Sequence, residues 1–176
     1  MKIGVIGAGG IGGTVGTLWA KAGHEVLFSS RNPDQLTDLV VTAGANTKAG
    51  TIAQATAFAN VILLAVYYWT TDAAIAAGSL DEKILIDATN PYIREADKII
   101  RVTDTSSGLE LAAKVPNAKV VKAYNTLPTA TFANEARRAD PYALFYCGDD
   151  APAKAIVAHL IADSGFAGVI SANWSK

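Results

Sequence analysis

Residues Gly7-Ala8-Gly9-Gly10-Ile11-Gly12 directly follow the apolar run Ile3-Gly4-Val5-Ile6, and together these two stretches decide the fold. A G-x-G-x-x-G stretch between a strand and a helix is typical of a dinucleotide-binding βαβ unit. In such a unit Gly7 permits the tight turn, Gly9 lets the backbone approach a pyrophosphate, and Gly12 lets the helix pack closely on the strand. The N-terminus of the helix supplies free N–H groups and a positive dipole end to the phosphates.

The end of the second predicted strand carries Ser29-Ser30-Arg31-Asn32 and no acidic residue. An Asp or Glu at this position would hold a ribose 2′-hydroxyl. Arg31 and the two serine hydroxyls can instead hold a 2′-phosphate, so the sequence predicts NADP(H) rather than NAD(H) as the cofactor. Two plainer interpretations stay open: Arg31 is an ordinary surface residue, and Ser30 or Asn32 caps a helix that begins at Pro33.

The chain has 176 residues, of which 51% are apolar and 18% charged, with a formal net charge of −1. This length predicts one domain over residues 1–176, and the low charged fraction suits a sheet buried on both faces. The net charge gives no electrostatic argument for a nucleic-acid or membrane partner. One cysteine and two histidines predict neither a disulfide nor a metal site.

The location follows from the N-terminus and from the longest apolar run. The first strand begins at Lys2, which leaves no room for a signal peptide. The apolar run from Val61 to Trp69 is less than half of the roughly 20 residues that a bilayer-spanning helix needs. We therefore expect a cytoplasmic protein.

Strands and helices alternate along the chain, which predicts a doubly wound α/β Rossmann fold with helices on both faces of a mainly parallel sheet. We expect about seven to eight strands, the first six in the order 3-2-1-4-5-6, and a ligand crevice between strands one and four. The expected strands are 2–6, 25–29, a short one within 43–50, 61–67, 83–87, 119–124, 143–147 and 168–171. The expected helices are 10–22, 33–42, 51–59, 69–77, 108–115 and 151–163.

The loops after strands four, five and six surround the nicotinamide end of the crevice in this fold. They carry Ala65-Val66-Tyr67-Tyr68-Trp69, Thr89-Asn90-Pro91-Tyr92 and Ala123-Tyr124-Asn125-Thr126-Leu127-Pro128. The three consecutive aromatic side chains either stack on a second ring system or pack against the following helix or a dimer partner.

No residue occupies the position of a general acid or base, so the catalytic residues are unknown. His24 lies at the wrong edge of the sheet and His159 on the late helix, and both are expected to be structural. Lys122 is expected at the surface, and Asp149-Asp150 is expected to cap the helix that follows. Hydride transfer between two cofactors needs no such acid or base, because the cofactors carry the chemistry.

With these motifs the chain resembles the deazaflavin-dependent NADP oxidoreductases, the coenzyme F-420:NADP reductase family, and also the reductase domain of the STEAP metalloreductases. The resemblance covers most of the chain, and its most specific motif is Val120-Val121-Lys122-Ala123-Tyr124-Asn125-Thr126-Leu127. It also rests on Gly7–Gly12, Gly23–Val26, Ser30-Arg31, Asp87–Pro91, Cys147–Asp150 and Ser164–Phe166.

The resemblance implies that the glycine loop and Ser30-Arg31 bind the pyrophosphate and the 2′-phosphate, and that the later loops line the nicotinamide. The predicted cofactor-binding residues are Gly7, Ala8, Gly9, Gly10, Ile11, Gly12, Ser30, Arg31, Asn32, Ala65, Val66, Tyr67, Asn90, Pro91, Ala123 and Asn125.

The predicted function is an NADP(H)-dependent oxidoreductase that transfers hydride between NADPH and a deazaflavin such as coenzyme F-420, a flavin such as FMN, or a similar small acceptor. A homodimer is expected, because an open nicotinamide crevice exposes apolar surface. Two alternatives stay open. One is a non-catalytic NADP(H) sensor, and the other is a reductase of a small carbonyl or imine whose site is completed by a dimer partner.

Overall fold

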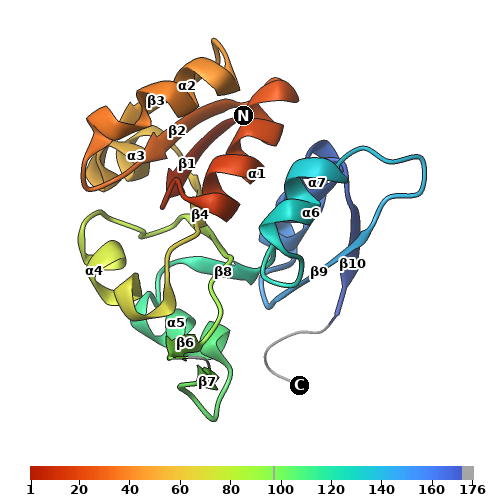
Figure 1. The fold of residues 1–176 in the computed structure, drawn as a ribbon. Coiled ribbons are helices and arrows are strands. Elements are labelled where there is room, and N and C mark those ends of the chain that lie inside the picture. The colour runs from red at the N-terminus through yellow and green to blue at the C-terminus, as the bar shows by residue number, and fades with distance from the viewer. Residues whose placement is uncertain (97, 172–176) are drawn as a thin grey trace.

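A computed structural model describes residues 1–96 and 98–171 (Figure 1). The strands are β1 (Lys2–Ile6), β2 (Glu25–Ser29), β3 (Thr47–Gly50), β4 (Val61–Leu64), β5 (Ile84–Asp87), β6 (Tyr92–Glu95), β7 (Lys98–Arg101), β8 (Lys119–Lys122), β9 (Ala143–Gly148) and β10 (Ala167–Ile170). The α-helices are α1 (Gly10–Lys21), α2 (Thr37–Ala43), α3 (Ile52–Phe58), α4 (Thr71–Ala76), α5 (Ser107–Lys114), α6 (Thr129–Asn134) and α7 (Ala151–Asp163). Two 3₁₀ turns, η1 (Pro33–Leu36) and η2 (Tyr68–Thr70), precede α2 and α4.

Within the described residues, eight strands form one sheet in the order β10-β9-β8-β5-β4-β1-β2-β3. The six strands from β8 to β3 are parallel, so the predicted order 3-2-1-4-5-6 is confirmed. Strand β9 runs antiparallel to β8, and β10 runs parallel to β9. The fold is therefore the predicted doubly wound, mainly parallel α/β Rossmann fold.

Every buried position of the central strands β1 and β4 is apolar, and successive side chains point to opposite faces. Ile3, Val5 and Leu63 belong to the core cluster that contains Trp19 of α1 and the buried apolar side chains of α7. Ile6, Ile62 and Leu64 belong to the second cluster, which contains Ala74 of α4 and Leu111 of α5. Burial on both faces explains why these strands appear as continuous apolar runs.

Polar side chains set where two of the helices begin. Thr51 and Gln54 form a reciprocal capping box at the start of α3, with hydrogen bonds of 3.2 and 2.8 Å. Asp150 accepts a hydrogen bond of 2.7 Å from the Ala153 N–H and caps α7, as the sequence predicted.

Several predicted elements are shorter than expected. The strand expected at 61–67 ends at Leu64, because its neighbours β1 and β5 end at Ile6 and Asp87 and offer no further ladder partners. The strand expected at 119–124 ends at Lys122, and Tyr124 has a φ of +64° that no strand accommodates. The helices expected at 33–42 and 69–77 both begin as 3₁₀ turns.

Two elements were not predicted, namely the β6–β7 hairpin and helix α6 (Figure 1). The hairpin pairs only with itself, and α6 spans six residues with two β-branched threonines, so neither shows a strong periodic pattern. Among the described residues, no helix combines the length and apolar character needed to cross a membrane.

Candidate functional site

A cleft of about 830 Å³ opens at the carboxyl ends of β1 and β4, where the strand order reverses. Its lining includes the predicted residues Gly7, Ala8, Gly9, Gly10, Ile11, Ser30, Arg31, Ala65, Val66, Tyr67 and Asn90. The predicted residues Gly12, Asn32, Pro91, Ala123 and Asn125 are not part of the lining.

The glycine loop presents bare backbone to the cleft. Gly7 has a φ of +91°, and a Cβ there would lie 2.6 Å from the Ala65 carbonyl oxygen. A Cβ on Gly12 would lie 2.1 Å from the Gly7 carbonyl oxygen, so only glycine lets α1 approach the loop this closely. A Cβ on Gly9 would meet no atom within 4 Å, so this backbone is open to a ligand. The first turn of α1 carries no acidic side chain, which leaves its N-terminus suited to an anion.

Ser30 and Arg31 line the cleft at the end of β2. The hydroxyl of the buried Ser29 donates to the Val5 carbonyl at 2.7 Å, so the expectation that both serines face a phosphate was wrong for Ser29. Ser30 Oγ accepts from the Asn32 N–H at 3.1 Å and keeps its own proton free to donate. Asn32 is exposed, and its side chain makes no capping hydrogen bond. Within the part of the chain that the structure describes, the exposed Arg31 guanidinium has no hydrogen-bond or ion-pair partner.

The opposite wall of the cleft contains Asn90, which is held by Asn125. The Asn90 amide donates to the Asn125 carbonyl at 2.8 Å, and the Asn125 amide donates to Asn90 Oδ1 at 3.3 Å. Asn125 therefore orients Asn90 from behind the wall. Pro91 is buried and Ala123 is fully buried in the core, and their assigned place beside the nicotinamide stays a prediction.

Lys122 is not the surface residue that the sequence suggested. Its ammonium donates to Asp87 Oδ2 at 2.8 Å and to the Thr89 carbonyl at 2.5 Å. A third hydrogen bond, of 3.3 Å, reaches Ser107 Oγ. The Lys122 side chain is 12% exposed and that of Asp87 is 0% exposed, so this is a buried ion pair. Asp87 also accepts from the Thr89 N–H at 2.8 Å, so the pair fixes the backbone that leads to Asn90.

The three aromatic residues after β4 separate in space. The rings of Tyr67 and Trp69 stack on each other with centroids 4.6 Å apart and planes 6° apart, and both are largely exposed. Tyr68 turns the other way and donates to Glu110. That hydrogen bond, together with burial, raises the pKa of Tyr68 to about 12. Of these three aromatic residues, Tyr67 and Tyr68 line the cleft and Trp69 does not.

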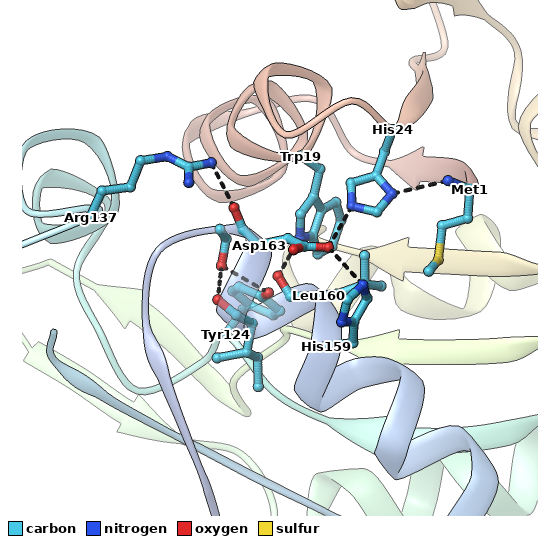
Figure 2. Close-up of polar contacts among 10 residues, drawn as sticks. Met1, Trp19, His24, Tyr124, Arg137, His159, Leu160 and Asp163 are labelled. Atoms are coloured by element: carbon cyan, nitrogen blue, oxygen red, sulfur yellow. Dashed lines mark hydrogen bonds and ion pairs between the residues drawn. The ribbon is translucent and has the colours of Figure 1, made fainter.

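Both histidines take structural positions, as the sequence indicated (Figure 2). The N-terminal ammonium of Met1 lies 3.1 Å from His24 Nδ1, and His24 Nε2 lies 2.8 Å from Asp163 Oδ2. His159 Nε2 lies 3.2 Å from the same Asp163 oxygen. These contacts join the start of β1 and the α1–β2 turn to the end of α7, and none of the four residues lines the cleft.

Sequence reasoning missed some of the lining. Thr129, the first residue of α6, lies beside the glycine loop, since a Cβ on Gly10 would come within 3.1 Å of Thr129 Oγ1. No local sequence signal marks a residue so far along the chain. The other lining residues that the sequence did not indicate are Ile6, Leu36, Ile52, Thr70, Ala73, Ala74, Ala77 and Ala88. Four further lining residues belong to segments that the sequence placed around the crevice, namely Ser29, Tyr68, Thr89 and Tyr92.

Comparisons with known proteins agree with this geometry. The family model described as NADP oxidoreductase coenzyme F420-dependent matches residues 2–91, just over half of the chain. The metalloreductase STEAP3 of Rattus norvegicus is 29% identical over 168 residues, which are 94% of this chain and 32% of that protein. The chain thus spans about a third of the length of the curated relative that it matches.

Solved structures show the same fold. A hypothetical protein from Sinorhizobium meliloti superposes with a TM-score of 0.89 at 30% identity, covering 99% of this chain and 86% of that one. A provisionally assigned F420-dependent NADP-reductase from Arthrobacter sp. FB24 superposes with a TM-score of 0.87 at 29% identity, covering 98% and 85% of the two chains. A reductive aminase from Aspergillus terreus in complex with NADPH has a TM-score of 0.73 at 20% identity, covers 98% of this chain and 55% of its own, and shows the fold alone.

Proposed function

Because the chain belongs to the family of coenzyme F420-dependent NADP oxidoreductases, we propose that it transfers hydride between NADPH and a deazaflavin, a flavin or a similar small acceptor. The observation that carries the proposal is the cleft itself. A bare glycine loop and the N-terminus of α1 lie at one end of it, next to Ser30 and Arg31.

The polar groups of the cleft fit NADP(H) better than NAD(H). The Arg31 guanidinium and the Ser30 hydroxyl are donors suited to a 2′-phosphate, and the α1 N-terminus suits the pyrophosphate. None of the described lining residues is an Asp or Glu, so no carboxylate is present to hold a ribose 2′-hydroxyl.

The same lining supports an acceptor that needs no acid or base from the protein. The described residues around the cleft include no His, Asp, Glu, Lys or Cys. Three tyrosines line it, Tyr67, Tyr68 and Tyr92, and the hydroxyl of Tyr68 already donates to Glu110. A bound NADPH would supply the hydride, and the acceptor would take up one proton as well. The role of this chain is then to bind and orient: the glycine loop holds the phosphates, and Asn90, fixed by Asn125, orients polar groups at the far end.

The exposed ring of Tyr67 at the mouth of the cleft supports a planar acceptor. A flat aromatic face binds a second ring system by stacking, and the Trp69 ring behind Tyr67 holds it in place. The same exposed rings support the proposal of a homodimer, which light scattering tests directly.

Stopped-flow absorbance at the nicotinamide band tests the function. NADPH is mixed with the protein and with a deazaflavin, FMN or a ferric chelate in turn. Protein-dependent oxidation by the deazaflavin or FMN is expected. If NADPH binds tightly and no acceptor oxidises it, the proposed hydride transfer to these acceptors is wrong and the NADP(H)-sensor alternative is favoured.

A further inference from the structure

A second, smaller cavity of about 140 Å³ adjoins the cleft. Tyr68 and Thr89 line both spaces, so the two cavities are neighbours. We call it the side pocket; its other lining residues are Trp69, Thr71, Asp72, Ser107, Glu110, Leu111 and Lys114. The proposed nucleotide contacts use none of these residues.

One lining residue of the side pocket, Thr71, carries an unsatisfied hydroxyl. Thr71 is 5% exposed, and its Oγ1 is the one buried side-chain polar atom among the described residues that has no hydrogen-bond partner. Buried hydroxyls are almost always hydrogen-bonded, because leaving one unpaired is costly. A hydrogen-bond acceptor on a bound molecule removes that cost.

A second hydroxyl has a proton to give. Ser107 is 7% exposed, and its Oγ accepts from Lys122 at 3.3 Å. Within residues 1–96 and 98–171, no acceptor is recorded for the Ser107 hydroxyl proton. Two lining residues of the side pocket therefore carry buried hydroxyl donors, Thr71 at the start of α4 and Ser107 at the start of α5.

The Glu110 carboxylate is the remaining polar group of the lining that determines which kind of ligand the side pocket can bind. Its Oε1 accepts from Thr103 and Thr105, and its Oε2 accepts from Tyr68. These hydrogen bonds lower the pKa of the Glu110 carboxyl to about 2, so it is ionised at neutral pH. A carboxylate oxygen accepts two hydrogen bonds, and Oε2 keeps one position for a further donor.

The charges around the side pocket disfavour an anion. The lining carries two carboxylates, Asp72 and Glu110, and one ammonium, Lys114, which pairs with Asp72 at 2.5 Å, so the charges of the lining sum to −1. A neutral group that both accepts and donates matches the two hydroxyls and the carboxylate. Amides and imides carry this combination, a carbonyl oxygen beside an N–H.

We propose that the side pocket binds the amide or imide edge of the hydride acceptor, with its carbonyls accepting from Thr71 and Ser107 and its N–H donating to Glu110. The assignment rests on the proposed function, because the side pocket adjoins the cleft where hydride transfer would occur. Flavin and deazaflavin rings carry such an edge on their pyrimidine ring. The volume of about 140 Å³ is below the roughly 300–1,000 Å³ of a whole-ligand pocket and suits an edge alone.

The test is a fluorescence titration with lumiflavin in the presence of saturating NADP⁺, so that no hydride is transferred. Thr71→Val and Ser107→Ala should each weaken lumiflavin binding by about tenfold, the effect of one lost hydrogen bond, and leave NADP⁺ binding unchanged. Thr71→Val should also fold as well as the wild type, because it removes a hydroxyl that has no partner. Thr56→Val, a buried threonine of α3 outside both cavities, is the matched control and should bind lumiflavin normally.

A change in the ligand completes the test. The analogue 3-methyllumiflavin replaces the imide N–H by a methyl group, and the wild type should bind it at least about tenfold more weakly than lumiflavin. Equal binding of the two flavins, lumiflavin binding unaffected by both variants, or no lumiflavin binding at all overturns the proposal. A loss of NADP⁺ affinity in Thr71→Val assigns the side pocket to the nicotinamide and also overturns it. If edge-dependent binding is found but the stopped-flow experiment shows no hydride transfer, the side pocket stands and the proposed function fails.

Discussion

The two walls of the cleft are built in different ways. The wall formed by the glycine loop and the end of β2 presents backbone, and its shape depends on Gly7 and Gly12, which are five residues apart. The opposite wall is built from side chains that meet across the fold. Asp87 and Lys122, like Asn90 and Asn125, are 35 residues apart in the chain.

This difference shows how each wall responds to substitution. The backbone wall has no room for a Cβ at Gly7 or Gly12 but contains no buried charge, so changes there act mainly on the ligand or on local packing. The side-chain wall depends on a desolvated ion pair, so losing one partner acts on the whole fold.

Lys122→Met should give the largest effect and is the sharpest test of the side-chain wall. It leaves the Asp87 carboxylate fully buried without its countercharge, and breaking a buried ion pair in this way costs about 3–5 kcal/mol. Urea unfolding measures the loss. Lys114→Met breaks the exposed pair with Asp72 and should cost less than about 1 kcal/mol. Equal losses of unfolding free energy in the two variants would show that the buried Lys122–Asp87 pair matters no more to stability than the exposed pair.

Arg31→Ala tests whether the Arg31 side chain, at the end of the backbone wall, binds the 2′-phosphate of NADPH. Losing a charge-assisted hydrogen bond removes roughly 1.5–3 kcal/mol, so NADPH should bind about 10- to 100-fold more weakly while NADH is nearly unchanged. Isothermal titration calorimetry with both nucleotides measures this. Arg138→Ala, whose guanidinium pairs with Glu135 outside the cleft, should alter neither affinity. An equal loss for both nucleotides in Arg31→Ala would refute the role of Arg31.

Gly12→Ala tests the close packing within the backbone wall. The added Cβ would lie 2.1 Å from the Gly7 carbonyl, and such overpacking costs on the order of 1–3 kcal/mol of stability. Thermal unfolding should show the loss. Gly9→Ala places its Cβ in open space, so it should leave the melting temperature unchanged and weaken NADPH binding. A melting temperature lowered as far by Gly9→Ala as by Gly12→Ala would contradict the assigned roles.

The smallest effect concerns Glu110, behind the side-chain wall. Hydrogen bonds from Thr103, Thr105 and Tyr68 lower the pKa of this carboxyl from 4.5 to about 2. A carboxyl with a lowered pKa stabilises the fold fully above its unfolded pKa and loses that contribution as pH falls through its folded pKa. The melting temperatures of wild type and Glu110→Gln should therefore differ by a constant amount above about pH 5 and converge toward pH 2.

Because Glu110 is partly exposed, the pH effect should be modest. Replacing both Thr103 and Thr105 by valine should remove most of it, since these two hydroxyls are the main cause of the lowered pKa. Parallel melting curves for wild type and Glu110→Gln from pH 6 to pH 2 would exclude the assigned hydrogen bonds.

The sequence alone determined the sheet and the backbone wall. Three features are local patterns: the apolar strands, the spacing of Gly7, Gly9 and Gly12, and the lack of an acidic residue at the end of β2. They predicted the strand order and the position of the cleft. Such features can be read from a sequence because strand burial and glycine conformation depend on neighbouring residues.

Only the tertiary structure decided the side-chain wall. The register of β5 with β8 places Asp87 beside Lys122, which turns an apparent surface lysine into half of a buried ion pair. The same folding joins Asn90 to Asn125, directs Tyr68 to Glu110, and leaves the Thr71 hydroxyl without a partner in the side pocket. These pairings depend on which polar groups are buried together on folding. The separation of two residues along the chain does not show whether folding will bury them side by side.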